Sequence, residues 1–435
     1  MINCRKETVK LLNRTFAQDA YSNILLDNVF AENEISAQDR KFITTLYYGV
    51  VERKITLDYI ISFYSTKGIN KLDTTILNIL RTGLYQIKYM DSVPDNAAVN
   101  ESVKLARNFR LASASGFVNA VLRRFIRDGA QFKEPSDVRE KMSVMYSVDT
   151  KIADLICKGY GEKFTEIFLA RSLEKTPVYL RRNSIMCDED AFIKGMGNIK
   201  VTPENNIPMC YRADSGNLLY TDSFKKGYFH VQDISSQFSC MALAPKPGET
   251  VLDMCAAPGG KTFTIAQLMN GTGVVHAFDI HSHRVKLIED GAKRLGLENI
   301  KATVGDASVH NSEYDGADKI LCDVPCSGIG VIRKKPEIRY KTPDDFKELP
   351  CLQYKILENA SKYLKPGGEL VYSTCTLNRS ENDDVIDRFL KENEDFEGVP
   401  FLQDYGEPFG GYKVTLGSDS FNSDGFFISK IRRKR

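Results

Sequence analysis

The fold is decided by residues 251–262, which read Val251-Leu-Asp-Met-Cys-Ala-Ala-Pro-Gly-Gly-Lys-Thr262. The apolar start predicts a buried strand that ends at Asp253, and the glycine pair Gly259-Gly260 predicts a turn before a helix. Small residues in the loop let a ligand approach the backbone closely, and the helix N-terminus offers free N–H groups. This stretch therefore predicts a strand, a ligand-binding loop and a helix in succession.

The same alternation continues on the C-terminal side of this stretch. Apolar runs at 274–279, 300–304, 319–322 and 369–373 predict further strands, and 261–269 and 283–295 predict helices between them. Ser380 is expected to cap a helix that follows the last of these strands. Strands that alternate with helices indicate a parallel sheet with right-handed crossovers, so residues 231–435 are expected to form a Rossmann-like α/β domain.

Four acidic residues stand at the ends of four successive predicted strands. They are Asp253, Asp279, Asp306 and Asp323, and Asp279 lies 20 residues after Gly259, where a doubly wound nucleotide fold places the carboxylate for ribose hydroxyls. Any one of them alone could be a helix cap or a solvated turn. Because ligands of such sheets bind at the carboxyl ends of the strands, the four together predict a ligand site.

The glycine loop does not fit the common nucleotide motifs. It lacks the G-x-G-x-x-G pattern of dinucleotide-binding folds. Gly260-Lys261-Thr262 matches the end of a P-loop, but Cys255 stands where that motif has its first glycine and Pro258 stiffens the loop. A P-loop-like NTPase stays an alternative at this point.

The chain contains ten cysteines and no apolar signal core after its first residues, which favours reduced thiols and a cytoplasmic location. Five of them are expected to be small buried hydrophobic residues, namely Cys4, Cys157, Cys187, Cys210 and Cys240. Cys326 and Cys375 differ because each follows a predicted strand at the ligand-bearing edge, where a thiolate can act as a nucleophile. Lys261 and the loop N–H groups could supply the positive charge that a thiolate needs. No zinc-finger spacing, H-E-x-x-H or C-x-x-C motif is present, so neither a metal nor a disulfide redox role is predicted.

The N-terminal part has a different pattern. Ile76, Ile79, Leu80, Leu84 and Ile87 recur at helical spacing, so residues 1–135 are expected to form an all-α bundle. Residues 136–230 mix predicted helices with short strands, one of them beginning after Pro177, and are expected to form a small intermediate α/β domain.

Charge and hydropathy exclude some classes of protein. Lys and Arg number 59 against 57 Asp and Glu, a net charge of +2, so the whole molecule is not polybasic. No apolar run approaches 18 residues, so no membrane span is expected. Local basic clusters could bind a phosphate backbone or could be an ordinary solvated surface; they are Arg107 with Arg110, Arg123 to Arg127, Arg181 with Arg182, Arg333 to Lys335, and Arg432 to Arg435.

Taken together, the motifs resemble a known family. The stretch from Asp253 to Thr262 is similar to the S-adenosylmethionine loop of RNA cytosine-C5 methyltransferases. Asp323-Val-Pro-Cys326-Ser-Gly and Tyr372-Ser-Thr-Cys375-Thr resemble that family's two cysteine motifs, and segments 231–237, 330–336 and 424–427 also match in the family's order. Phe117-Val-Asn-Ala-Val-Leu-Arg-Arg-Phe125 resembles the NusB RNA-binding domain. This combination is similar to the Sun/Fmu (RsmB) family of bacterial 16S rRNA cytosine-C5 methyltransferases.

The resemblance implies methylation of C5 of a cytosine in 16S ribosomal RNA, with S-adenosylmethionine as cofactor and free RNA or a partly assembled small subunit as substrate. It implies that Cys375 is the nucleophile, that Cys326 assists product release, and that Asp323 and Lys261 act beside them. A monomer is expected. The residues that it implies for cofactor binding are Cys255, Ala256, Ala257, Pro258, Gly259, Gly260, Lys261, Asp279, Arg284, Asp306 and Asp323. A non-enzymatic ribosome-assembly factor is the main alternative, and the two intact cysteines argue against it.

Overall fold

The computed structural model describes residues 3–18, 22–66, 68–204, 207–214, 216–417 and 421–435. These residues form two compact units. The smaller comprises Met1–Leu155 and Lys334–Pro343, and the larger comprises Ile156–Arg333 and Asp344–Arg435. The expected division into three domains at residues 135 and 230 stays a prediction.

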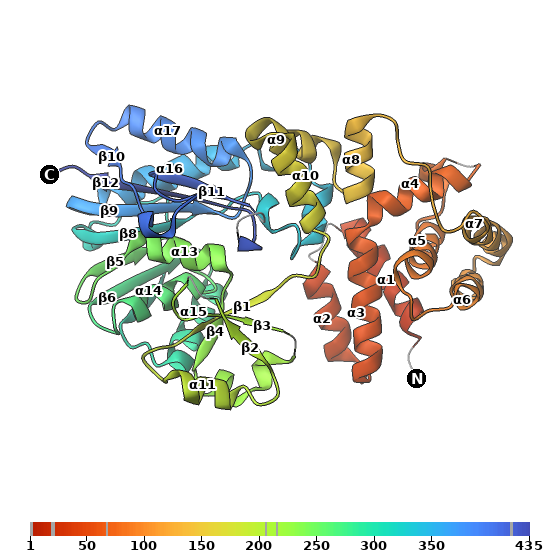
Figure 1. Ribbon diagram of the computed structural model, residues 1–435, viewed down its shortest axis with the longest axis horizontal. Coiled ribbons are helices and arrows are strands. Elements are labelled where there is room, and N and C mark those ends of the chain that lie inside the picture. Colours follow the sequence, from red (N-terminus) through yellow and green to blue (C-terminus); the bar gives the residue numbers. More distant parts are fainter. Residues whose placement is uncertain (1–2, 19–21, 67, 205–206, 215, 418–420) are drawn as a thin grey trace. The chain divides into compact units, whose positions relative to one another are not determined.

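The smaller unit is the helical bundle that the apolar spacing predicted, shown in red and orange in Figure 1. Ile76, Ile79, Leu80 and Leu84 all lie in its buried core. Asp73 begins one helix by accepting hydrogen bonds from the backbone N–H groups of Thr75 and Ile76, as an N-cap residue does. The helices are α1 (Cys4–Gln18), α2 (Ser22–Glu32), α3 (Ala37–Glu52), α4 (Lys54–Tyr64), α5 (Thr74–Tyr89), α6 (Asp95–Asn108), α7 (Ser115–Arg127) and α8 (Val138–Tyr146), followed by α9 (Thr150–Tyr160), which runs across the boundary between the units.

The short segment Lys334–Pro343 belongs to this helical unit, although it lies within the stretch 231–435 that we expected to form one domain. Arg339 is 0% exposed, and its Nη1 donates to the carbonyl of Tyr146 at 2.9 Å. The hydroxyl of Tyr340 donates to the carbonyl of Val51. These hydrogen bonds to backbone explain how an arginine and a tyrosine are accommodated in an apolar interior.

The larger unit begins with α10 (Glu162–Arg171) and a small antiparallel sheet in the order β2-β3-β1-β4. The strand expected after Pro177 is its third member, β1. Leu180 in β1 lies opposite Tyr211 on one side and Val231 on the other. The elements are β1 (Val178–Arg182), α11 (Glu189–Gly195), β2 (Val201–Pro203), β3 (Cys210–Ala213), α12 (Asp222–Lys225) and β4 (Phe229–Val231).

The main sheet of the larger unit has the order β10-β12-β9-β8-β5-β6-β7, with β11 paired to β12. Strands β5 to β9 pair in parallel, as the alternation predicted, and β12 runs antiparallel to its neighbours. The strands are β5 (Thr250–Asp253), β6 (Val274–Asp279), β7 (Ile300–Val304), β8 (Ala317–Asp323), β9 (Leu364–Thr374), β10 (Phe396–Gly398), β11 (Lys413–Leu416) and β12 (Phe426–Arg433).

Side chains that alternate along each strand enter two separate cores. Val251 packs with helices α13 to α15 on one face of the sheet, and its neighbour Leu252 packs with α16 and α17 on the other. Figure 1 shows the helices on both faces of the green-to-blue sheet. The helices are α13 (Ile234–Leu243), α14 (Gly260–Leu268), α15 (Ser282–Leu295), α16 (Leu349–Lys362) and α17 (Asp383–Glu392).

The sheet has a switch point between β5 and β8. From β5 the chain continues to β6 and β7 on one side and then returns to β8 and β9 on the other. In such sheets a crevice opens outside the carboxyl ends of the two strands where the order reverses. Asp253 and Asp323 end those two strands, so the fold itself marks this edge as the place for a ligand.

One expectation about this region is wrong. Ser380 does not cap the following helix, because it lies inside a single 3₁₀ turn, η8 (Arg379–Glu381), where its hydroxyl donates to Asn378 Oδ1 at 2.9 Å. Asn382 precedes α17 and makes no side-chain cap hydrogen bond to it. The sequence thus correctly predicted a helix after β9, but α17 begins at Asp383 and not directly after Ser380.

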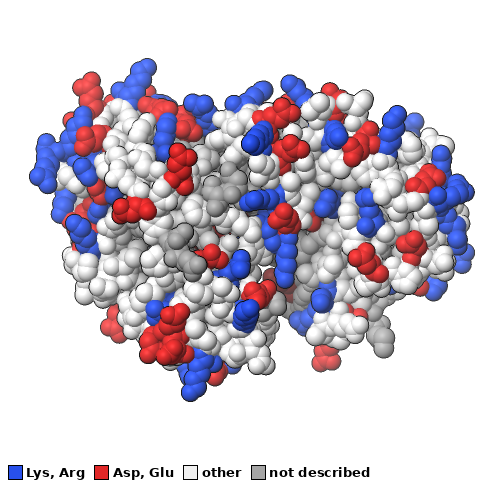
Figure 2. All heavy atoms as spheres, viewed as in Figure 1, with Lys and Arg blue, Asp and Glu red and all other residues white. Residues whose placement is uncertain are grey.

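Basic and acidic side chains are interspersed over the face that Figure 2 shows, in agreement with the net charge of +2. None of the helices in the described part of the chain combines the length and the apolar character that a membrane span requires.

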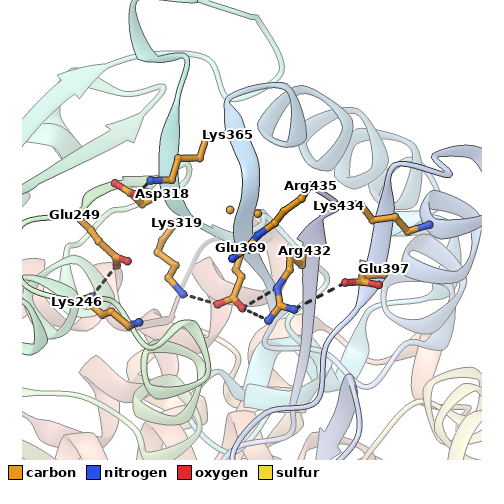
Figure 3. A pocket seen from close by; sticks show the side chains of 12 residues that line it. Lys246, Glu249, Asp318, Lys319, Lys365, Glu369, Glu397, Arg432, Lys434 and Arg435 are labelled. Carbon is orange, nitrogen blue, oxygen red and sulfur yellow. Dashed lines mark hydrogen bonds and ion pairs between the residues drawn. The ribbon is translucent and has the colours of Figure 1, made fainter.

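A charged pocket of about 480 Å³ lies at the edge of the sheet opposite the switch-point crevice, where β8, β9 and β12 meet (Figure 3). The carboxylate of Glu369 in β9 forms an ion pair with Lys319 of β8. It forms two more with residues of β12, Arg432 at 2.7 Å and Lys430 at 3.0 Å. Burial alone would raise the pKa of Glu369, but the hydrogen bonds from these three cations lower it to about 2. One carboxylate therefore holds the antiparallel strand to the parallel part of the sheet.

We expect Glu369→Ala to lower the free energy of unfolding by roughly 3 kcal/mol at pH 7, because three cations then lose their shared partner. A carboxyl whose pKa is lowered on folding stabilises the protein above its ordinary pKa, here 4.5, and loses that effect as the pH falls towards 2. Urea denaturation should therefore show a gap between variant and wild type that narrows from pH 7 to pH 3. An equal gap at both pH values would contradict the prediction.

Candidate functional site

Two cysteines that are far apart in sequence meet at the carboxyl edge of the sheet. Asp323 at the end of β8 lies opposite Ser373 of β9, and the pairing extends one step further because the N–H of Val324 donates to the carbonyl of Ser373 at 3.1 Å. Cys326 and Cys375 follow these strands, and their Sγ atoms lie 3.2 Å apart. The predicted pair of edge cysteines is therefore a pair of thiols in contact.

The loops that carry the thiols are held by an unusually close backbone contact. The N–H of Gly330 donates to the carbonyl of Cys375 at 3.0 Å, and the N–H of Gly425 donates to the carbonyl of Gly330 at 2.8 Å. A Cβ atom at Gly330 would lie only 1.8 Å from the carbonyl oxygen of Gly425. Glycine is therefore required at position 330 for three chain segments to meet behind the thiols.

Lys261 places a positive charge beside the thiols. Its Nζ lies 2.7 Å from Asp323 Oδ2, and the hydroxyl of Ser373 donates to the other oxygen of that carboxylate at 2.8 Å. Burial opposes the charge on Lys261, but the ion pair with Asp323 outweighs this effect and raises the pKa of Lys261. Cys375 also interacts electrostatically with Lys261, so a thiolate at Cys375 and the ammonium stabilise each other.

The two cysteines are not equivalent. The hydrogen bond with Cys375 is the largest cause that raises the pKa of Cys326 well above its ordinary value, and burial adds to it. Either sulfur can be the donor of the hydrogen bond between them, and the charge of Lys261 acts on Cys375. Because only a thiolate is strongly nucleophilic, the pair can supply one nucleophile and one proton-bearing partner.

Asp253 is a buried carboxyl group at the end of β5. It is 1% exposed, and its Oδ2 accepts a hydrogen bond from the hydroxyl of Thr262 at 2.7 Å. Its Oδ1 has no hydrogen-bonding partner among the residues that the structure describes. Burial is the main cause that raises the pKa of Asp253 to about 7, and the charge of Asp323 adds to it.

A cavity of about 210 Å³ lies in front of the glycine loop. Gly259, with φ at +107°, makes the turn that leads the loop into α14. The loop thus presents its backbone to the cavity, as the small residues predicted. The lining residues are Val231, Gln232, Asp233, Ser236, Asp253, Cys255, Ala256, Ala257, Pro258, Gly260, Lys261 and Asp323.

Asp279 ends β6 beside the same loop, and Arg284 connects the two. The Nη1 of Arg284 lies 3.1 Å from Asp279 Oδ2, and its Nη2 donates to the carbonyl of Ala257 at 2.9 Å. Arg284 lines neither the cavity at the glycine loop nor the second cavity, which lies beside β7. It therefore fixes the loop and Asp279 relative to each other.

The second cavity, of about 250 Å³, lies beside the end of β7 and is largely aromatic and apolar. Phe278, Tyr314 and Tyr363 line it, together with Met254 from the glycine loop. Asp306 also lines this cavity, and its Oδ1 accepts hydrogen bonds from the N–H and the hydroxyl of Ser308, both at 2.8 Å. A flat apolar slot with one carboxylate suits a planar ring that carries hydrogen-bond donors.

The structure therefore brings the predicted residues to one edge of one sheet. Gln232, Asp233 and Ser236 were missed as lining residues, although they lie in the segment 231–237 that carried part of the family resemblance.

No group of three or more His, Cys, Asp or Glu side chains within the described ranges is arranged to hold a metal ion.

Comparisons with known proteins show which family the chain resembles over its whole length. The family model described as 16S rRNA methyltransferase RsmB/F matches residues 240–432, and the NusB family model matches residues 2–127. A probable ribosomal RNA small subunit methyltransferase B of Bacillus subtilis is 37% identical over 433 residues and covers 95% of each chain. One of Synechocystis is 34% identical over 448 residues and covers 100% of each.

The fold also has a solved counterpart. The crystal structure of PH0851 has a TM-score of 0.82 to this chain, with 24% sequence identity and coverage of 100% of this chain and 99% of that one. At that identity the likeness supports the fold alone.

We expect Asp253→Asn to stabilise the larger unit at alkaline pH. A carboxyl whose pKa is raised on folding stabilises the protein most below its ordinary pKa, here 3.8, and this effect is lost as the pH rises through about 7. The amide copies the neutral carboxyl, so the variant should be near wild type at pH 4 and more stable than wild type by about 3 kcal/mol at pH 8. Urea denaturation at both pH values measures this, and a stability difference that does not change with pH would refute it.

Proposed function

The chain belongs to the 16S rRNA methyltransferase RsmB/F family, and we propose that it transfers a methyl group from S-adenosylmethionine to C5 of a cytosine in 16S ribosomal RNA through a covalent bond to Cys375. The single observation that carries the covalent part of the proposal is the contact of two thiols beside Lys261 at the ligand-bearing edge.

The two cavities at this edge fit the proposed cofactor. The aromatic slot with Asp306 suits an adenine ring, and Asp279 at the end of β6 suits the ribose hydroxyls. The loop from Cys255 to Lys261 and the buried Asp253 would take the methionine part, since Asp253 Oδ1 lacks a hydrogen-bonding partner in the described part of the chain and the cofactor carries positive charge. When bound, S-adenosylmethionine supplies a methyl group on a positively charged sulfur.

A cysteine thiolate can make C5 of cytosine reactive enough to accept a methyl group. C5 of cytosine is a poor nucleophile, so it does not attack a methyl group unaided. When the Cys375 thiolate forms a bond to C6, the electrons of the C5–C6 double bond become available and C5 resembles an enamine carbon. After C5 has taken the methyl group, a base removes the C5 proton, and the electrons of that C–H bond expel the Cys375 sulfur from C6.

The neighbouring side chains support these steps. Lys261 stabilises the thiolate of Cys375 before attack and again when the sulfur leaves. Asp323, held by Lys261 and Ser373, would accept hydrogen bonds from the donor edge of cytosine. Cys326 is in contact with Cys375 and would exchange its proton as the sulfur leaves, which agrees with a role in product release.

The target base must reach the thiols at the edge of the sheet, and a base that is stacked in an RNA helix cannot do so. Extruding a base from its stack costs a few kcal/mol, so unpaired or loop cytosines are favoured. The rest of the RNA would be recognised by shape and by phosphate contacts with the basic clusters, on free RNA or on a partly assembled subunit.

We expect Cys375→Ala to lower methylation by more than about 10³-fold, because the attack on C6 then lacks the thiol that Lys261 activates. We expect Cys326→Ala to form an RNA adduct that survives denaturing electrophoresis, because release of the sulfur is slowed. Bisulfite sequencing of 16S rRNA from a deletion strain, complemented with each variant, would detect the lost cytosine mark.

The control is the wild-type gene, which should restore one C5-methylcytosine. If Cys375→Ala restored it fully, the covalent mechanism would be wrong. If no position changed on deletion, the chain would act on another RNA or serve as an assembly factor.

A further inference from the structure

Glu381 is a buried acid that the proposed chemistry does not use. It lies in η8, behind the thiol pair, and is 0% exposed. Its carboxylate makes no ion pair with any cation in the described ranges, since all its partners are neutral groups. A buried carboxyl group without a counter-charge is costly unless it is hydrogen-bonded, and Glu381 accepts hydrogen bonds at both of its oxygens.

Those hydrogen bonds come from both cysteine loops and from the helix behind them. Oε2 accepts from the backbone N–H of Ser327 and from Nε2 of Gln353, each at 2.9 Å. Oε1 accepts from Nδ2 of Asn378 at 2.9 Å. Ser327 directly follows Cys326, and Asn378 comes three residues after Cys375, so one carboxylate connects the two loops.

Further contacts make this connection rigid. The Nε2 of Gln353 also donates to the carbonyl of Pro325 at 2.9 Å, so the residues on both sides of Cys326 are held. The hydroxyls of Ser327 and Thr376 lie 2.7 Å apart and form a second link between the loops. The backbone carbonyl of Glu381 accepts from the hydroxyl of Tyr372 at 2.6 Å, which fixes η8 to β9.

The charge of Glu381 also acts on the thiols. The groups that face Cys326 are Cys375, Glu381 and Asp323, and each negative charge among them adds to the hydrogen bond and the burial that raise the pKa of Cys326. Tyr372 lies close by, and burial, together with the charges of Glu381 and Asp323, raises its pKa. The cation of this group, Lys261, interacts electrostatically with Cys375. The acids near Cys326 therefore act in the direction that keeps a proton on its sulfur.

We propose that Glu381 is a positioning residue for the covalent chemistry, which holds the loops of Cys326 and Cys375 in contact and keeps the proton on Cys326. The inference rests on the proposed function for its catalytic consequence. Its effect on the thiols can be measured without RNA.

The first test is Glu381→Gln, which removes the charge and presents an amide N–H₂ to the N–H₂ of Asn378. We expect kcat for methylation to fall about 100-fold, while the affinity for S-adenosylmethionine stays within twofold, because the cofactor loop is not touched. Alkylation of Cys326 by iodoacetamide, followed by peptide mass spectrometry, should have its pH midpoint lowered by about one unit. A residue with only a packing role would not move that midpoint.

Two further variants separate charge from position. Glu381→Asp keeps the carboxylate but shortens the side chain. We therefore expect the pH midpoint of Cys326 alkylation to equal that of wild type and kcat for methylation to be about tenfold lower. The double variant N378D/E381Q reverses the direction of one hydrogen bond and restores every pairing, since the new carboxylate still accepts from Ser380. The kcat of the double variant should be at least tenfold higher than that of E381Q. Asp384→Asn removes an exposed charge three residues further on and is the matched control, with wild-type behaviour expected.

The results decide between the possibilities. A folded E381Q with unchanged kcat and an unchanged Cys326 midpoint would overturn the proposal, as would a loss of cofactor affinity equal to the loss of kcat. If E381Q does not fold, wild-type kcat in Glu381→Asp would overturn it. If wild-type protein fails to methylate 16S rRNA, the proposed function fails, and the alkylation midpoints still decide whether Glu381 controls the thiols.

Discussion

The parallel pairing of β8 with β9 is the interaction on which the site depends. Asp323 lies opposite Ser373, and this register brings two cysteines that are 49 residues apart in sequence to a separation of 3.2 Å. Successive side chains on a strand point to opposite faces, so a slip of one residue would turn Ser373 away from Asp323 and separate the thiols. The charged cluster around Glu369 holds the other end of the same strand pair, together with β12. The distance between the two thiols thus depends on hydrogen bonds and ion pairs at both ends of β9.

Three carboxyl groups in the larger unit show how the surroundings determine what an acid does. Glu369 is surrounded by three cations and serves to join strands. Asp253 accepts one hydrogen bond from a hydroxyl, and burial raises its pKa to about 7, which suits a group that faces a positively charged ligand. Glu381 is held by neutral donors only and adds to the effects that raise the pKa of Cys326. The differences follow from the donors that each position supplies, and not from the residue type.

Local pattern was enough to predict most of the α/β architecture. The strand from 274 to 279 and the helix that follows it were predicted nearly to the residue, because apolar runs and glycine breaks are short-range features. The acids at the strand ends followed from the same pattern together with the rule that such sheets bind at their carboxyl edge. Glu381 could not be found in this way, because its partners lie in three separate segments. The error at Ser380 has the same origin, since the contacts of Asn378 and Glu381 shape that turn.

The segment Lys334–Pro343 limits how far the two units can be treated as independent domains. The chain leaves the larger unit eight residues after Cys326, contributes Arg339 and Tyr340 to the helical core, and returns to the larger unit. A truncated chain that ended at residue 155 would lack both side chains. The carbonyls of Tyr146 and Val51 would lose their hydrogen-bond donors inside an apolar interior, at a cost of about 1–3 kcal/mol for each unsatisfied group. The helical unit therefore needs a piece of the sequence that lies between Cys326 and Cys375, and a division of the chain at one point in the sequence cannot separate the two units.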